Sequence, residues 1–246
     1  RRRHTRYWRD WSSDVCSSDL AKIGIADKVI SSISQTTEEK ISSSGSGSII
    51  GHVNGGTLIL TAAHVCQLDL NQILFVFPYY KEKQHSLKIS YLHQVIDYEG
   101  VAHKGYILAI SQKSDTCVLL TEYIDYPSIP LAANPVEEFE KVYSINFPRG
   151  IWQAKLSPTL EGHFIGYLKV ADRNVLAFSM RSAPGSSGGI IINTNGEAVS
   201  LIYAYLASFD EFTLGASMGE IREILDNSSY IFSSRAEYYN NLLKNN

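Results

Sequence analysis

The sequence predicts an all-β fold built from two antiparallel barrels. Strand-length apolar runs recur at short intervals, and polar or glycine-bearing turns separate them. Before residue 218 no long segment shows a clean helical period. The runs form two sets of similar size on either side of Pro127–Glu140, a segment with three prolines. Many short strands at this spacing are typical of a barrel or a sandwich, and two similar sets favour two packed barrels.

The first set begins with a hairpin. Gly47–Val53 and Thr57–Thr61 are expected to be its strands, because the intervening Asn54–Gly56 turn holds residues that accept a positive φ. After Thr61 the chain is expected to leave the strand in a short turn. Further strands of this set are predicted at Ile73–Tyr79, Leu87–Ile96, Tyr106–Ser111 and Thr116–Leu120.

The second set has about six predicted strands, followed by helix. The strands are expected at Lys141–Phe147, Ile151–Leu156, His163–Val170, Val175–Met180, Gly189–Asn193 and Ala198–Tyr205. Apolar residues at helical spacing predict a helix over Met218–Leu225 and a second helical piece over Arg235–Leu243. We therefore expect a first barrel over residues 46–130, a second barrel with its terminal helix over 131–226, and a partly helical tail over 227–246.

The N-terminal part is expected to lie outside this fold. Asp10–Leu20 looks like the translation of a common sequencing-adapter oligonucleotide, so residues 1–20 are treated as non-native rather than as a polar tail. Residues 21–45 are weakly patterned and run into the Ser/Gly stretch Ser42–Ser48, which predicts a flexible segment. Because the native start is then expected to be missing, a signal peptide is not judged and no compartment is assigned.

Composition narrows the classes of partner. The chain has 246 residues, 44% of them hydrophobic, and a net charge of −3. The absence of a basic run argues against nucleic acid, and no apolar stretch is long enough to span a membrane. The sequence does not indicate an oligomeric state.

Two cysteines lie in apolar runs of the predicted barrels. Neither Cys66 nor Cys117 has metal-ligand spacing to another cysteine or to a histidine pair. We therefore expect two buried free thiols and no metal, with a disulfide between them as the alternative. A fold without cystine bridges is compatible with a reducing compartment but does not require one.

Three motifs carry candidate chemistry. Thr61-Ala62-Ala63-His64 comes first, a run beginning at Asp115 (Asp-Thr-Cys-Val-Leu-Leu) comes second, and Gly185-Ser186-Ser187-Gly188-Gly189 comes third. In this order the motifs resemble those of the chymotrypsin-like, or trypsin-like, serine peptidases, and the resemblance covers roughly Gly45–Asp226. It implies two packed six-stranded antiparallel Greek-key barrels with a short C-terminal helix.

The resemblance also implies a role for each motif. Ser187 would attack the scissile carbonyl, His64 would carry the proton, and Asp115 would orient His64. The backbone N–H groups of Gly185 and Ser187 would form the oxyanion hole. These residue types suit the chemistry, because a serine hydroxyl is a weak nucleophile unless a base such as imidazole lies beside it. No cofactor is implied.

Each of these residues also has a structural alternative. The Gly-Ser-Ser-Gly run alone is typical of a surface loop, His64 alone of a satisfied core histidine, and Asp115 alone of a turn cap. Ser186 is the rival nucleophile, but the Gly-x-Ser-Gly-Gly register favours Ser187. Two other acidic candidates, Asp97 and Glu99, lack the apolar run that follows Asp115.

A different hydrolase class also shares the Gly-x-Ser-x-Gly pattern. In α/β-hydrolases the catalytic histidine follows the serine, whereas the last histidine of this chain is His163. We reject that class for this reason and because alternating helices are missing. Ser186 stands where trypsin carries an aspartate, so activation through a new N-terminus is not expected. The Pro-Gly-x-Ser-Gly-Gly form and the expected lack of disulfides most resemble the disulfide-free bacterial, heat-shock-related and viral branches of the family. No PDZ domain is expected in this chain.

The sequence indicates the residues of the specificity pocket less clearly than those of the three motifs. Arg181 lies six residues before Ser187, and it would favour acidic side chains if it faced the pocket or would face solvent otherwise. Tyr203 and Tyr205 are expected on the strand that pairs with the substrate. His163 is a further candidate by loose analogy with glutamyl endopeptidases, against the alternative of an exposed loop histidine.

The sequence therefore predicts a serine endopeptidase that forms an acyl-enzyme on a protein or peptide substrate. The alternative is a catalytically silent relative that binds peptides or proteins in the same cleft. A domain that processes a viral polyprotein would be a variant of the first hypothesis. Neither the natural substrate nor the cleavage preference is indicated.

Overall fold

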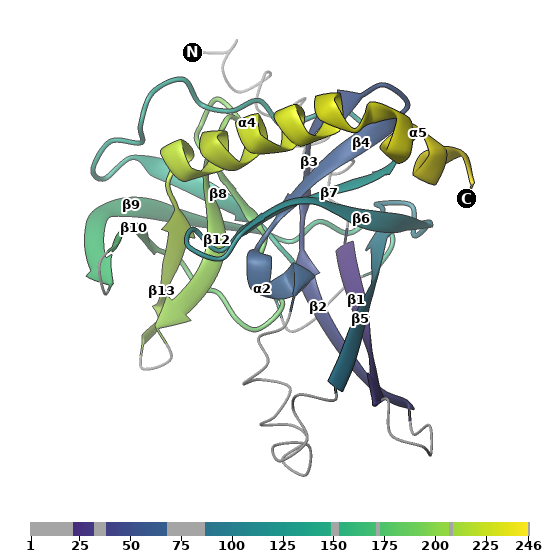
Figure 1. Cartoon of the computed structure of the whole chain (residues 1–246). Helices are drawn as coiled ribbons and strands as arrows, with labels where there is room; N and C mark the ends of the chain where they lie inside the picture. Colours follow the sequence, from purple (N-terminus) through teal and green to yellow (C-terminus); the bar gives the residue numbers. More distant parts are fainter. Residues whose placement is uncertain are drawn as a thin grey trace.

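The computed structural model describes residues 22–31, 38–67, 87–148, 153–170, 173–206 and 209–245. It is mostly β-structure arranged as a seven-stranded sheet and a closed six-stranded barrel, with a C-terminal helix lying across both (Figure 1). The predicted all-β class with a terminal helix is confirmed, and the second predicted barrel is closed and six-stranded, whereas the first β-unit is a seven-stranded sheet.

The first unit is an antiparallel sheet in the order β2-β1-β5-β6-β7-β4-β3. Its strands are β1 (Lys22–Ser31), β2 (Glu38–Ser46), β3 (Ser48–Val53), β4 (Gly56–Thr61), β5 (Leu87–Ile96), β6 (Ala102–Ser111) and β7 (Thr116–Glu122). The predicted hairpin is formed by β3 and β4, and Gly55 takes a φ of 83° in its turn. The short helix α2 (Ala63–Cys66) follows β4 at once. The strand predicted at 73–79 lies outside the described residues.

Strands β1 and β2 correct the expectation of a flexible segment up to residue 45. β1 pairs with β2 on one side and with β5 on the other, so both residue ranges belong to the sheet. The sequence of β1 and β2 gives little sign of this pairing, because backbone hydrogen bonds do not depend on side-chain type.

The second unit is a closed barrel in the order β10-β13-β12-β11-β8-β9. Its strands are β8 (Lys141–Ile145), β9 (Thr159–Val170), β10 (Arg173–Ser179), β11 (Ile190–Ile192), β12 (Ala198–Leu206) and β13 (Phe209–Ala216). The strand predicted at Ile151–Leu156 is wrong for its described part, where Lys155 has a left-handed φ of 65°. β13 takes the sixth place instead, although its first half carries two acidic residues that break the apolar pattern.

Helix α4 (Met218–Ser234) and helix α5 (Ala236–Lys244) follow β13 at the predicted positions, and α4 is longer than expected. Ser217 and Glu220 form a capping box at the start of α4, which satisfies two backbone N–H groups there. Within the described part of the chain, no helix is long and apolar enough to cross a membrane.

The main hydrophobic core joins both β-units to α4. Buried side chains from β4 and β7 (Leu58, Leu120), from β11 (Ile190) and from α4 (Ile221, Ile224) belong to one cluster. The helix lies over both units in Figure 1 and shares their core, so it holds the first sheet against the barrel. This packing fixes the relative position of the loops that leave each unit.

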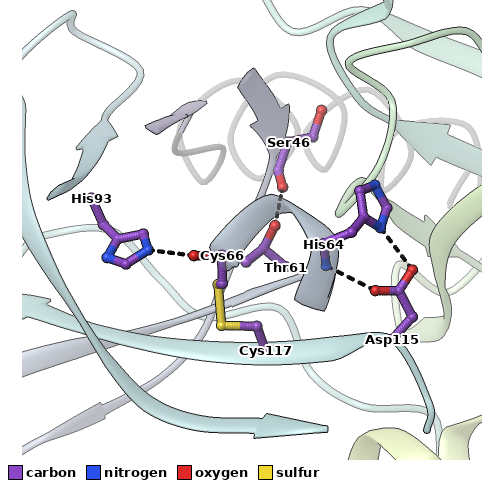
Figure 2. Close-up of a disulfide and its surroundings, with 7 residues drawn as sticks. All are labelled: Ser46, Thr61, His64, Cys66, His93, Asp115 and Cys117. Atoms are coloured by element: carbon purple, nitrogen blue, oxygen red, sulfur yellow. Dashed lines mark hydrogen bonds and ion pairs between the residues drawn. A yellow bond between two sulfur atoms is a disulfide. The ribbon is translucent and has the colours of Figure 1, made fainter. Parts of the chain in front are cut away.

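A disulfide joins Cys66 to Cys117, so the expectation of two free thiols is wrong (Figure 2). Cys66 ends α2 and Cys117 is the second residue of β7. Thr61 lies opposite Cys117 in the β4–β7 ladder, and α2 begins two residues after Thr61. The sheet register therefore places the two thiols together, although 51 residues separate them. The likeness to disulfide-free relatives does not extend to this bond.

Removing the disulfide should destabilise the protein. A double variant, Cys66→Ala with Cys117→Ala, is expected to lose about 2–4 kcal/mol of unfolding free energy, because the unfolded chain gains the freedom of a long open loop. Chemical denaturation measures the loss. Alkylation in denaturant before and after reduction is the direct control: modification of both cysteines before any reductant is added would contradict the bond.

His93 of β5 lies beside the disulfide, and its Nε2 is 2.7 Å from the carbonyl oxygen of Cys66 (Figure 2). A carbonyl only accepts, so Nε2 carries the proton. The residue is 5% exposed. Burial lowers the pKa of His93 below 6.5, although the hydrogen bond to Cys66 acts in the opposite direction.

The buried ring should make stability fall in acid. Because the pKa of His93 is lower in the folded chain, the unfolded chain binds more protons once the pH drops below 6.5. The contribution of His93 is complete above that pH and is lost as the pH falls toward the lowered pKa. We expect His93→Gln to lose less stability than the wild type between about pH 7.5 and about pH 5.5 in chemical denaturation. Equal losses would contradict the buried neutral ring.

Candidate active site

His64 and Asp115 meet through two hydrogen bonds. His64 lies on α2, and its backbone N–H donates to Asp115 Oδ1 over 2.9 Å. Its ring Nδ1 is 2.7 Å from Asp115 Oδ2. Because a carboxylate accepts, Nδ1 carries the proton and Nε2 is left as the basic nitrogen of the neutral ring. Figure 2 shows both bonds on one side of α2 and the disulfide on the other.

The carboxylate of Asp115 also completes the start of α2. The helix cap residue, Ala62, offers no side-chain acceptor to the free N–H groups of the first turn. Asp115 supplies it from the turn before β7, where its backbone takes a left-handed φ of 51° that aspartate tolerates. The Asp115 side chain is 19% exposed and that of His64 is 37% exposed, so the imidazole reaches solvent while its partner is shielded.

Ser187 lies in a loop made of two consecutive tight turns. In the first turn the N–H of Ser186 donates to the carbonyl of Ala183, with Pro184 and Gly185 between them. The φ of 95° at Gly185 gives the type II geometry that a Pro-Gly pair favours. In the second turn the N–H of Gly189 donates to the carbonyl of Ser186, and Gly188 has a φ of 84°.

The backbone N–H groups of this loop are almost all used. Ser186 and Gly189 donate within the turns, and Gly188 donates to the carbonyl of Ile202 on β12. The N–H groups of Gly185 and Ser187 donate to no acceptor in the described part of the chain. Two unpaired donors on alternate residues beside a serine hydroxyl are a kind of arrangement that can stabilise a negatively charged oxygen.

The loop packs closely against the first sheet. A Cβ added to Gly188 would lie 2.0 Å from the carbonyl oxygen of Ser46 and 2.2 Å from Thr61 Oγ1. A Cβ on Gly45 would lie within 3 Å of both the Val65 side chain and the carbonyl oxygen of Ser187. The backbone around Ser187 therefore lies beside the residues that flank His64 in the chain.

The Ser187 hydroxyl makes no hydrogen bond to His64 among the contacts of the described residues. Catalytic hydrogen bonds are often long without substrate and shorten when it binds. The packing of the loop, rather than that bond, places the backbone of Ser187 beside residues that flank His64 in the chain.

The rival candidates are engaged elsewhere. Ser186 Oγ is buried and donates to Asn146 Oδ1 over 2.9 Å. Asp97 accepts from the N–H of Val101 and lies 3.1 Å from the ring of His103. Glu99 forms an exposed ion pair with Lys155. None of these four contacts involves His64.

The candidate pocket residues are less clearly grouped. Arg181 is exposed just after β10, and His163 is exposed on β9, opposite Lys141 of β8. Tyr203 on β12 is half-buried, with the Arg173 guanidinium 5.3 Å from its ring centre. Burial raises the pKa of Tyr203, and Arg173 acts against that rise. Tyr205 belongs to β12, but its side chain lies outside the described residues.

Two residues near the site are missing from the sequence-based candidates. Ser46 donates its backbone N–H to the carbonyl of Ser187, and Asn146 binds Ser186. Neither stands near a motif in the chain, so only the fold assigns them to the site. In the described ranges, no group of three or more His, Cys, Asp or Glu side chains is placed to hold a metal ion.

One family of known proteins matches the chain. A family profile described as a trypsin-like peptidase domain matches residues 45–201. The match covers well over half of the chain and includes His64, Asp115 and Ser187. No protein with a curated function matches the chain.

Solved structures share the fold at low identity. A serine endoprotease from Yersinia pestis aligns with a TM-score of 0.61 and 15% identity over 90% of this chain and 66% of its own. The active form of the Rv3671c protease from M. tuberculosis gives 0.62 and 14% over 89% and 86%. The HtrA-type protease AlgW, solved with a decapeptide, gives 0.63 and 13% over 89% and 65%. This chain thus spans about two thirds of the Yersinia and AlgW chains.

The close packing at Gly188 predicts an unequal pair of glycine variants. Gly188→Ala is expected to lose about 3 kcal/mol or more of unfolding free energy, because its Cβ would overlap Ser46 and Thr61. Gly55 has nearly the same φ, 83°, but no atom within 4 Å of an added Cβ. Gly55→Ala should therefore lose only about 1–2 kcal/mol from the left-handed backbone. Chemical denaturation compares the two, and equal losses would contradict the packing.

Proposed function

Because the chain belongs to the trypsin-like peptidase family, we propose that it is a serine endopeptidase working through Ser187, His64 and Asp115. The observation that carries this proposal is the double hydrogen bond between His64 and Asp115. It holds the imidazole in the tautomer whose Nε2 can accept a proton, which is the state a general base requires.

The first half of the reaction forms an acyl-enzyme. Ser187 Oγ attacks the carbonyl carbon of the scissile peptide and passes its proton to His64 Nε2. The carbonyl π-bond electrons move to oxygen, and Asp115 stabilises the imidazolium. When the tetrahedral species collapses, the C–N bond breaks and His64 gives the proton to the leaving amine. An ester on Ser187 remains.

The second half regenerates the enzyme. Water attacks the ester carbonyl and gives one proton to His64 Nε2, and a second tetrahedral species forms. Its collapse breaks the bond to Ser187 Oγ, which takes the proton back from His64. In both halves the oxyanion would lie between the N–H groups of Gly185 and Ser187, and losing one such donor typically slows a reaction about 10²- to 10³-fold.

The family implies protein or peptide substrates. How this chain would select among them is part of the proposal. From residue 203 onward β12 extends beyond its pairing with β11, and the backbone there would pair with an extended substrate as an added strand. Tyr203 and Tyr205 would then flank the bound chain, with Tyr203 set by its contact with Arg173. Arg181 and His163 stay candidate specificity residues, each exposed to solvent in the free protein.

Active-site labelling tests the proposal. We expect a fluorophosphonate probe to label the wild-type protein covalently at Ser187 and to leave Ser187→Ala unlabelled, because only an activated hydroxyl attacks the probe at a useful rate. Intact mass spectrometry and peptide mapping measure the adduct. The adduct should persist in a variant of the neighbouring hydroxyl, Ser186→Ala. A folded wild-type protein that stays unlabelled would contradict the enzyme and favour the peptide-binding alternative.

A further inference from the structure

Ser46 is the last residue of β2, and each of its hydrogen-bonding groups has a partner. It is fully buried. Its N–H donates to the carbonyl of Ser187 over 2.7 Å, and its Oγ donates to the carbonyl of Gly185 over 2.8 Å. The same Oγ accepts from the N–H of Phe147 over 2.9 Å, and its carbonyl accepts from Thr61 Oγ1 over 2.7 Å. Figure 2 shows the contact with Thr61.

These contacts fix two peptide groups of the loop that holds Ser187, residues 183–189. A peptide group is planar, so holding its oxygen also sets the direction of its N–H. Ser46 Oγ holds the Gly185–Ser186 peptide, and the Ser46 N–H holds the Ser187–Gly188 peptide. The unpaired N–H of Gly185 belongs to the peptide just before the Gly185–Ser186 peptide. The unpaired N–H of Ser187 belongs to the peptide just before the Ser187–Gly188 peptide.

We propose that Ser46 is a positioning residue of the oxyanion hole, and this rests on the proposed function. Glycine at 185 makes the first turn easy to rotate, because a residue without a Cβ has several low-energy conformations. The Ser46 hydroxyl removes that freedom by binding the Gly185 carbonyl from the first sheet. The first β-unit thus aligns the donors carried by the second.

The chain provides a matched control two residues further along. Ser48 is also fully buried, but its Oγ has no hydrogen-bond partner among the described residues. Ser48→Ala therefore removes a hydroxyl of the same size and burial without freeing the loop. Ser46→Ala removes the hydroxyl and leaves the Gly185 carbonyl and the Phe147 N–H without that partner.

Fluorophosphonate kinetics measure the effect on chemistry. In Ser46→Ala we expect the maximal labelling rate to fall about 10- to 100-fold, because misaligned donors stabilise the transition state less. The probe concentration at half-maximal rate should change less than about threefold, since binding before reaction does not need the hole. The pH dependence of labelling should keep its shape, because His64 and Asp115 are untouched. Ser48→Ala should label at the wild-type rate.

Hydrogen exchange reports on the loop independently of activity. Amides of the segment 182–189 should exchange faster in Ser46→Ala than in the wild type or Ser48→Ala, because the anchored peptides are released. Should Ser46→Ala fail to fold, Ser46→Cys makes the same comparison, since a thiol fills the site but donates weakly.

The outcomes separate the two proposals. Slower labelling together with faster exchange, both confined to Ser46 variants, supports the positioning role. Unchanged exchange, or a labelling rate within about twofold of wild type in a folded Ser46 variant, overturns it. If the wild type is not labelled at all, the proposed function is wrong, and faster exchange in Ser46→Ala still supports the anchoring of the loop.

Discussion

The candidate site depends on the contact between the loop that holds Ser187, residues 183–189, and the first sheet. Gly188 lies so close to Ser46 and Thr61 that no side chain fits there. This approach brings the backbone of Ser187, from the closed barrel, to the residues beside His64, from the first sheet. The two halves of the site come from different β-units, so their alignment is a property of tertiary packing. Helix α4 and the shared core maintain that packing.

Within the first sheet, one short helix and one turn carry the hydrogen-bonded pair His64 and Asp115. A four-residue helix has little stability of its own. Here the Asp115 carboxylate binds its first turn and the disulfide ties its last residue to β7. His64 itself makes the first of these attachments, and Cys66 makes the second two residues further along. The same carboxylate therefore supports the local backbone and orients the ring, which leaves the imidazole little freedom to turn away.

The sequence predicted the parts of the fold and site that depend on local pattern. His64 and Ser187 stand in short motifs, and the helix at 218 shows its period. The disulfide, strand β13 and the role of Ser46 depend on register or on contacts between distant segments, which composition and spacing do not encode. Arg181 illustrates the same limit, since counting residues from Ser187 gives its place in the chain but not the direction of its side chain.

In the proposed mechanism, the backbone N–H groups of Gly185 and Ser187 already point to where the oxygen of the reacting carbonyl would lie. A crystal structure of the protein after reaction with a peptidyl boronic acid tests this alignment, since boron on Ser187 Oγ is tetrahedral like the reaction intermediate. We expect one boron-bound oxygen within about 2.7–3.1 Å of the N–H groups of Gly185 and Ser187, with the turn at Gly185 unchanged. An adduct whose oxygens all point to solvent, with the Gly185 N–H turned into the protein, would contradict it.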